Sequence, residues 1–292
     1  TSIIGAGETI LDGRVGDARG HTRFGLYMDG NFTLESNAVL HLIGESDSFS
    51  QSRNLYLLGS IVRDTGASGT TLLTETTGVS SSLVSALIDV DNIFMNTSTG
   101  IDVFSSSFIG KEINVTADTF LMSEDSDIIF ARNPNCNVHF STILLSFPGR
   151  RVFQDLSGCT VHFASDSIVT DILETTVTNS MPGNIVFEVG SVQAEEIELH
   201  HLGDTQLLTG VFEVENRVSI LDDLHGCGNV FSNNITFMGN TVPECNGFGN
   251  TTFNILGTTV SLHSVDGSSN NGTACLIESD LLLLAGNVST RS

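Results

Sequence analysis

Two stretches of the chain repeat one phrase at a distance of 23 residues. Residues 135–145 are NCNVHFSTILL and residues 158–169 are GCTVHFASDSIV, so Cys-x-Val-His-Phe followed by a small residue occurs twice. A recurring phrase at a fixed spacing is typical of folds that stack one structural unit on the next. This repeat constrains the fold more than any other feature of the sequence.

Related phrases continue the spacing along the chain. After Phe163 come GNIVFEV with Phe187, TGVFEV with Phe212, GNVFSN with Phe231 and GNTTFNI with Phe253, in steps of 24, 25, 19 and 22 residues. Alternation of apolar and polar residues indicates a strand with one buried face, and Gly or Asn suits a corner with positive φ. The pattern predicts an all-β parallel β-solenoid (a β-helix) with coils, or rungs, of about 23 residues.

Further stretches fit this interpretation. Alternating strands are predicted in NFTLESNAVLHLIG (31–44), LYLLGSIV (55–62) and CLIESDLLLLAG (275–286), while SVQAEEIELHHL (191–202) fits a helix or a strand with a bulge. An antiparallel β-sandwich or jelly roll is the alternative fold, although it has no reason to repeat a phrase in register. We expect one solenoid domain over residues 1–292, with residues 1–30 as an N-terminal cap or subunit contact segment.

The Gly- and Asn-led phrases, together with NFTLESNAVLHLIG, resemble the right-handed parallel β-helix superfamily. That superfamily includes pectin-lyase-like enzymes, tailspike-type viral fibres and the passenger parts of bacterial surface adhesins. The resemblance covers most of the chain and concerns its architecture.

The charge balance limits the partners of the chain. Asp and Glu total 34, Lys and Arg total 11, and Lys111 is the sole lysine, so the net charge of -23 comes from missing bases. This charge argues against nucleic acid or an anionic membrane as a partner. We expect no membrane insertion, because no apolar run is long enough to span a bilayer.

Cysteines and glycosylation sequons favour an extracellular, secreted protein at a cell or virion surface. The chain has five cysteines. Asn-x-Ser/Thr sequons, the candidates for N-glycosylation, occur at Asn31, Asn96, Asn114, Asn234, Asn250, Asn271 and Asn287.

Cys136 and Cys159 are the candidate disulfide pair. Stacking the two phrases in register would place their Cα atoms about 4.8 Å apart, within the range of about 4.4–6.8 Å that a disulfide needs. A stacked but unbonded pair is the alternative. Cys227, Cys245 and Cys275 form an odd set, for which one pair and one free thiol is the simplest arrangement.

Histidines and carboxylates are the other groups that could carry chemistry. His139 and His162 should point outward as a surface ladder or, alternatively, take a metal, although no confirming ligand stands at a suitable spacing. Asp89 with Asp91, and Asp125 with Asp127, would share one strand face, which suits acid–base work, Ca²⁺ or a solvated turn. We expect no metal and no cofactor.

An enzyme is the less favoured expectation. Asp222, Asp223 and His225 in ILDDLHGCGN invite comparison with polygalacturonase-like enzymes, but no Gly precedes His225 and no Arg-x-Lys follows it. One lysine, no tryptophan and two tyrosines also supply few bases and few aromatic platforms for sugars. These three residues are the catalytic candidates of the alternative, a polysaccharide-acting lyase or hydrolase.

The expected function is therefore a structural or adhesive subunit of an extracellular fibre, filament or spike. Its expected partners are copies of itself in a head-to-tail homo-oligomer, with glycans or a surface receptor as further partners. An uncapped solenoid exposes strand edges, which a second copy can cover. TSIIGAGETILDG (1–13) and CLIESDLLLLAG would be the contact surfaces; a third hypothesis is a β-sandwich pilin that donates residues 1–13 as a strand.

Overall fold

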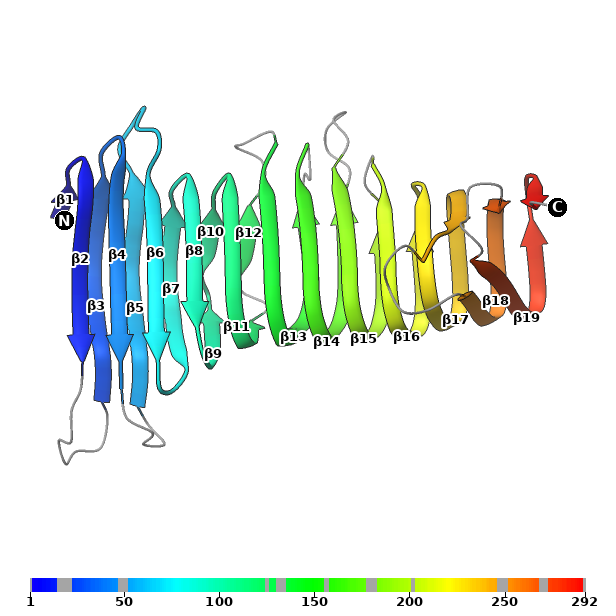
Figure 1. Ribbon diagram of the computed structural model, residues 1–292, viewed down its shortest axis with the longest axis horizontal. Helices are drawn as coiled ribbons and strands as arrows, with labels where there is room; N and C mark the ends of the chain where they lie inside the picture. The colour runs from blue at the N-terminus through cyan, green and yellow to red at the C-terminus, as the bar shows by residue number, and fades with distance from the viewer. Residues whose placement is uncertain are drawn as a thin grey trace. The chain divides into compact units, whose positions relative to one another are not determined.

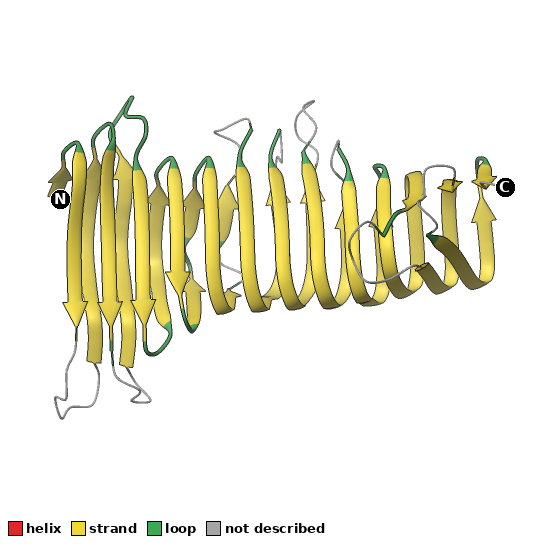
Figure 2. Cartoon of the chain, in the orientation of Figure 1, coloured by secondary structure: helices red, strands yellow, loops and turns green. Residues whose placement is uncertain are grey.

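The computed structural model describes residues 2–14, 23–46, 52–123, 126–129, 135–154, 158–176, 183–200, 203–245, 252–267 and 273–290. Strands make up most of this part of the chain, and it contains no helix (Figure 2). The all-β prediction is confirmed.

The chain divides into two compact units, residues 1–148 and residues 149–292. Each unit has its own stack of parallel strands. The single solenoid domain expected over residues 1–292 stays a prediction.

Twelve complete strands are described in the first unit, and β13 (Asn137–Gln154) contains the boundary between the units. The twelve are β1 (Ser2–Ile4), β2 (Gly7–Arg14), β3 (Arg23–Leu34), β4 (Ala38–Glu45), β5 (Ser52–Arg63), β6 (Thr71–Thr77), β7 (Ser81–Asp89), β8 (Asn92–Thr97), β9 (Gly100–Phe104), β10 (Ser107–Ile109), β11 (Glu112–Met122) and β12 (Asp127–Ile129).

One face of the first unit is a row of stacked parallel strands. It consists of β2, β4, β6, β8 and the first parts of β11 and β13 (Figure 1). An inward column of this row, in which each residue faces the next in register, contains Leu40, Leu72, Ile93, Ile113 and Val138. All five side chains are buried, and burying such a side chain contributes about 1.5–3 kcal/mol.

The opposite side of the first unit changes along the stack. In the early coils it is formed by single strands, β1, β3, β5 and β7. Residues 81–84 of β7 then pair with β9, whereas residues 87–89 pair with β10. Between them Ser85 has a φ of 51°, a left-handed conformation that turns a corner. The coil of β8, β9 and β10 therefore has three short strands where earlier coils have two.

The second unit uses longer strands. Its strands are β14 (Thr160–Thr176), β15 (Asn184–Leu199), β16 (Thr205–Ile220), β17 (Leu224–Pro243), β18 (Thr252–Gly267), β19 (Ala274–Leu284) and β20 (Val288–Thr290). From β14 to β18 each strand bends around the core (Figure 1). One buried inward column runs through Leu173, Ile197, Val218, Ile235 and Val260.

Every strand pairing described within the two units is parallel. The fold is therefore a parallel β-solenoid with coils about 23 residues apart, as the repeat predicted, and not an antiparallel sandwich or jelly roll. The spacing varies with the loops, because Ser2 faces Phe32 in the first coils whereas Leu72 faces Ile93 further on.

Residues 191–199 of the stretch SVQAEEIELHHL form a strand with a bulge and not a helix, and residues 201 and 202 lie outside the described residues. Strand β15 continues through it to Leu199, and its register with β16 shifts between Ala194 and Glu196. A bulge of this kind re-aims side chains without ending the ladder.

The phenylalanines of the repeated phrases do not form a single column. Phe163 faces Phe187, and their rings stack with centroids 5.1 Å apart, which matches the predicted step of 24 residues. Phe212, however, faces Val192 instead of Phe187. Val230 then faces Phe212, so the next residue, Phe231, points outward and is 37% exposed. Similar phrases thus place Phe187 inside and Phe231 outside.

This difference gives a matched pair of substitutions. We expect Phe187→Ala to destabilise the protein by about 3–5 kcal/mol, because it leaves a cavity between two coils. We expect Phe231→Ala to cost less than about 1 kcal/mol, because the ring is already partly in water. Chemical denaturation of both variants checks this, and equal losses would contradict the assignment of the two rings to opposite faces.

Candidate functional site

The last described coil of the second unit has an uncovered inner face. Leu282 and Leu284 of β19 face Val260 and Leu262 of β18 in register, and so continue two inward columns. Val260 and Leu262 are at most 1% exposed, whereas Leu282 is 42% and Leu284 47% exposed. All four side chains are apolar and share the same columns. The leucines are exposed because β18 covers only one side of them.

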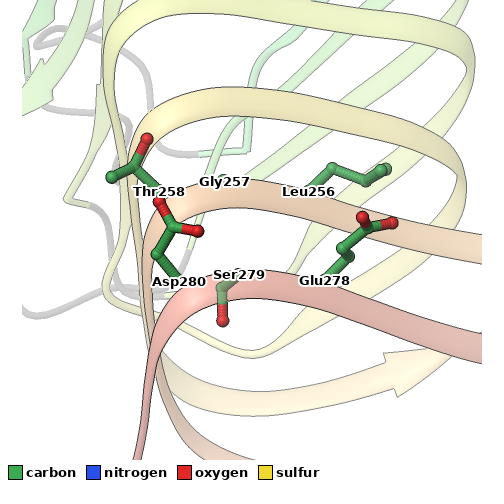
Figure 3. Close-up of a pocket in the computed structure, with 6 residues that line it drawn as sticks. All are labelled: Leu256, Gly257, Thr258, Glu278, Ser279 and Asp280. Carbon is green, nitrogen blue, oxygen red and sulfur yellow. The ribbon is translucent and has the colours of Figure 1, made fainter.

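An open depression lies on the outer surface of the same two strands. It is lined by residues 256–258 of β18 and 278–280 of β19. Figure 3 shows the carboxylates of Glu278 and Asp280 on either side of Ser279, with Thr258 on the neighbouring strand. Two carboxylates and a hydroxyl make this edge acidic and hydrophilic. The outer surface of β19 is therefore acidic around residues 278–280, whereas Leu283 of the same face is apolar.

The first coil of the other unit has a comparable edge. β1 and β2, which lie within the segment 1–30, are regular strands that pair in parallel with β3 and β4. Leu11 faces the buried Leu42 and is itself half-buried, while Ile4 faces the buried Leu34. Two inner positions of this coil, Ile4 and Leu11, are therefore apolar, while Thr9 faces the buried Leu40.

A charged cluster joins three successive coils at a corner of the first unit. Asp91 is buried, and its Oδ1 lies 2.9 Å from Nη1 of Arg63 and 3.5 Å from Nζ of Lys111. The backbone N–H of Thr70 donates to Oδ2 of Asp91 over 3.2 Å, and the N–H of Asp91 donates to Oγ1 of Thr70 over 2.9 Å. Arg63 also approaches Asp89, with Nε 3.5 Å from Oδ1.

This environment lowers the pKa of Asp91. Burial by itself would raise the pKa, but the hydrogen bond from Thr70, the charge of Lys111, the backbone of Gly69 and the charge of Arg63 outweigh it. Asp89 and Asp91 were candidates for acid–base work, Ca²⁺ binding or a solvated turn. Asp91 is instead a buried anchor for cations that the protein supplies. Asp125 lies outside the described residues, and the side chain of Asp127 is not described.

Sequence reasoning did not single out Arg63, Thr70 or Lys111. The sequence did contain a signal for Lys111. It is the sole lysine and follows Asp91 by 20 residues, which is close to the length of one coil.

Removing the charge of Asp91 should destabilise the protein mainly above acidic pH. We expect Asp91→Asn to lower the free energy of unfolding by about 2–3 kcal/mol near neutral pH. This loss is smaller than for a fully buried ion pair, because Lys111 is half exposed. Since the pKa of Asp91 is lower in the folded than in the unfolded chain, this contribution is present above the ordinary Asp pKa of about 3.9 and is lost as the pH falls through the folded value.

Denaturant unfolding of the wild type and Asp91→Asn over a series of pH values measures this difference. Asp118→Asn, which changes an exposed aspartate of the same unit, is the control and should follow the wild type. A deficit for Asp91→Asn that stayed constant into strong acid would contradict the lowered pKa.

The residues of the alternative enzyme hypothesis contact the neighbouring coil. Oδ1 of Asp223 accepts a hydrogen bond of 2.8 Å from the backbone N–H of Asn240. Nδ1 of His225 lies 3.0 Å from Oε2 of Glu244. Asp222 lies in the turn before Asp223 and is half-buried. The three residues are thus close in the chain, and the contacts described for Asp223 and His225 join one coil to the next.

Four of the five cysteines are disulfide-bonded. Cys227 and Cys245 form one bond, with Cα atoms 4.9 Å apart, and Cys275 is a free thiol, which is the arrangement favoured by the odd set of three. Cys136 and Cys159 are each disulfide-bonded as well. Cys136 belongs to the first unit and Cys159 to the second, and their bonding to each other stays a prediction.

The free thiol should react poorly in the folded protein. Burial raises the pKa of Cys275 to about 11, so little thiolate exists near neutral pH. We expect Ellman's reagent to modify the native protein slowly and the denatured, unreduced protein rapidly, at one thiol per chain. Cys275→Ser should show no reaction in either state. Two or more reactive thiols in the unreduced protein would contradict the disulfide assignment.

Five of the seven sequons lie in the described part of the chain. Asn31, Asn96, Asn234 and Asn287 are exposed, and Asn114 is half-buried on the outer face of β11. Asn250 and Asn271 lie outside the described residues. The four exposed side chains could carry a glycan without displacing the core.

The histidines point outward, as the alternation predicted. His139 lies between the buried Val138 and Phe140, and His162 lies between the buried Val161 and Phe163. Nε2 of His162 is 3.2 Å from a carboxylate oxygen of Glu188 on the next coil. Within the residues that the structure describes, no group of three or more His, Cys, Asp or Glu side chains could hold a metal ion.

No protein-family model, no curated protein and no solved structure matches this chain. No helix in the described ranges is long and apolar enough to cross a membrane.

Proposed function

We propose that the protein is a structural, adhesive β-solenoid that assembles end to end with copies of itself in an extracellular fibre, filament or spike. The observation that carries the proposal is the exposed inner face of β19, where Leu282 and Leu284 continue columns that are buried everywhere else in the stack. In the proposal, the coil that covers them is the first coil of another copy, formed by β1 and β2.

The energy of such a contact comes from two sources. Covering Leu282 and Leu284 would return them to the burial of Val260 and Leu262, and fully burying a leucine contributes about 1.5–3 kcal/mol. The open edge of β19 also offers backbone groups that a parallel strand can pair with. Ile4 and Leu11 on the inner side of β1 and β2 provide apolar partners at the receiving coil.

Charge should regulate the assembly. The chain carries a net charge of -23, so two copies repel each other at long range. Salt screens this repulsion over about 8–10 Å at physiological ionic strength, while the apolar contact is unaffected. Assembly should therefore be favoured at moderate ionic strength over very low ionic strength.

Two further features support an extracellular location. Four cysteines are disulfide-bonded, as is usual in oxidising compartments. Exposed sequons on the outer faces of strands leave room for N-linked glycans. The parallel coils and inward columns also support the resemblance to the right-handed parallel β-helix superfamily, which we keep as part of the proposal.

Paired substitutions on β19 test the assembly. We expect Leu282→Asp to lower the average mass of assemblies at least tenfold in sedimentation velocity, because it puts a charge on the surface that another coil must cover. Leu283→Asp is the matched control, since Leu283 is 50% exposed but belongs to the outer face, where it faces Ser261. Leu283→Asp should assemble like the wild type.

Electron microscopy of the same samples should show end-to-end particles for the wild type and Leu283→Asp only. A wild-type protein that stays monomeric at high concentration and moderate ionic strength would overturn the proposal. Equal effects of the two substitutions would show that the inner face of β19 is not the contact surface.

A further inference from the structure

Both tyrosines of the chain lie together on the outer surface of the first unit. Tyr27 of β3 faces Tyr56 of β5 in register, and their rings are nearly parallel, with centroids 5.4 Å apart and an interplanar angle of 8°. The ring of Phe24 contacts both, at 5.3 Å from Tyr27 and 5.1 Å from Tyr56. We call Phe24, Tyr27 and Tyr56 the aromatic platform.

The platform is turned toward solvent. Tyr27 is 50% exposed, although the following residue, Met28, is buried. Tyr56 stands between the buried Leu55 and Leu57, so its ring is on the outer face of the strand. A cross-strand aromatic pair by itself stabilises a sheet modestly, by about 0.2–1 kcal/mol. Packing alone would not require the rings to gather where water reaches them.

Polar groups continue the same outward column beyond the platform. In register, Tyr56 faces Ser82 of β7, and Ser82 faces Asp102 of β9. Nε of Arg53 donates a hydrogen bond of 2.7 Å to Oγ of Ser82, which brings the guanidinium across to this column. Ser82 itself is only 4% exposed and accepts from Arg53, so the polar groups that stand beside the exposed rings are the half-buried guanidinium of Arg53 and carboxyl of Asp102.

The carboxyl of Asp102 is held in a partly dry environment. Burial raises the pKa of Asp102, while the charge of Arg53 and a hydrogen bond from Ser80 oppose the rise. A carboxylate that is partly removed from water forms stronger hydrogen bonds with a ligand than one in bulk solvent.

Flat apolar surfaces combined with a few fixed polar groups are what a sugar ring needs. One face of a pyranose carries C–H groups that stack on an aromatic ring, while its hydroxyls need donors and acceptors at the edge. Coils follow each other at about 4.8 Å, close to the length of one sugar unit, so successive units can meet successive coils. The net charge of -23 disfavours an anionic ligand.

We propose that the aromatic platform, with Arg53 and Asp102, is a binding site for a neutral oligosaccharide, and that Ser82 positions the guanidinium of Arg53. A sugar ring stacks on Tyr27 and Tyr56, and its neighbour reaches the polar groups along the column. The site deepens the proposed adhesive role by naming a class of partner. It does not rest on self-assembly, because its residues belong to β3, β5, β7 and β9 of the first unit, whereas β19 belongs to the second.

The composition of the chain supplies a direct probe. The protein has no tryptophan and only two tyrosines, both in the platform, so its tyrosine fluorescence reports on this site alone. We expect a saturable change in tyrosine emission when the protein is titrated with at least one of cellotriose, maltotriose, mannotriose and chitotriose. Calorimetry with the same sugar should give the same affinity.

Substitutions then locate the site. Tyr27→Ala should weaken binding at least tenfold, because it removes the exposed ring, whereas Tyr27→Phe should bind within about threefold of the wild type. Asp102→Asn should weaken binding several-fold, because it removes the charged hydrogen-bond acceptor for the sugar hydroxyls. Phe231→Ala, which removes an exposed ring in the other unit, is the control and should bind like the wild type. Far-ultraviolet circular dichroism should show the same strand signal in all variants.

Two results would overturn the proposal. One is the lack of a saturable response to all four sugars. The other is an affinity that neither Tyr27→Ala nor Asp102→Asn lowers. Leu282→Asp should keep sugar binding while losing self-assembly, so failure of either proposal can be told apart from failure of the other.

Discussion

The structure depends on the stacking of each coil between two others. Backbone pairing is parallel, so a residue in one coil lies directly over its counterpart in the next, and inward side chains form columns. Val260 is fully buried in such a column, while Leu282, one coil further on, is 42% exposed. The core is therefore not a property of any one coil. It exists only where coils meet, which is why the last described coil is both apolar and uncovered.

Corners impose a second constraint, because a chain that turns inside a stack leaves backbone groups that the strand ladders cannot satisfy. Polar side chains meet this need in the first unit. Oδ1 of Asn54, which is fully buried, accepts from the N–H groups of Ser46 and Val79, and its amide donates back to Val79. Asp91 does the same at another corner and adds charge, using two of the few basic residues in the chain.

The outer face is free of the packing constraint, and the features with a proposed ligand lie there. Substitution of an outward residue leaves the inward columns unchanged, so rings, hydroxyls and carboxylates can follow one another along a column. The column of Tyr27, Tyr56, Ser82 and Asp102 is an example, in which only Ser82 is buried. The two proposals thus use different strands and different faces: assembly uses the inner face of an open coil, and sugar binding uses the outer face of β3, β5, β7 and β9.

The sequence by itself determined the strand content, the parallel stacking and the approximate coil length, because alternation and repeat spacing are local, countable properties. It also placed His139 and His162 outward and matched Phe163 with Phe187. It could not determine which residues of successive coils share an inward column. A register shift of one residue moves the following side chains to the opposite face, and such a shift lies between Leu208 and Val211 in the pairing of β16 with β17, before Phe231 points outward.

Only the tertiary structure brought together residues from different coils. Tyr27 and Tyr56 are 29 positions apart, and their contact depends on loop lengths that no phrase in the sequence reveals. Gly226 shows the same dependence: it stands in the column of Leu207, where a side chain would collide with the ring of Phe253 from the following coil. Local pattern determines which face of a strand is apolar, but stacking decides which residues meet, because register is set by the whole circuit of each coil.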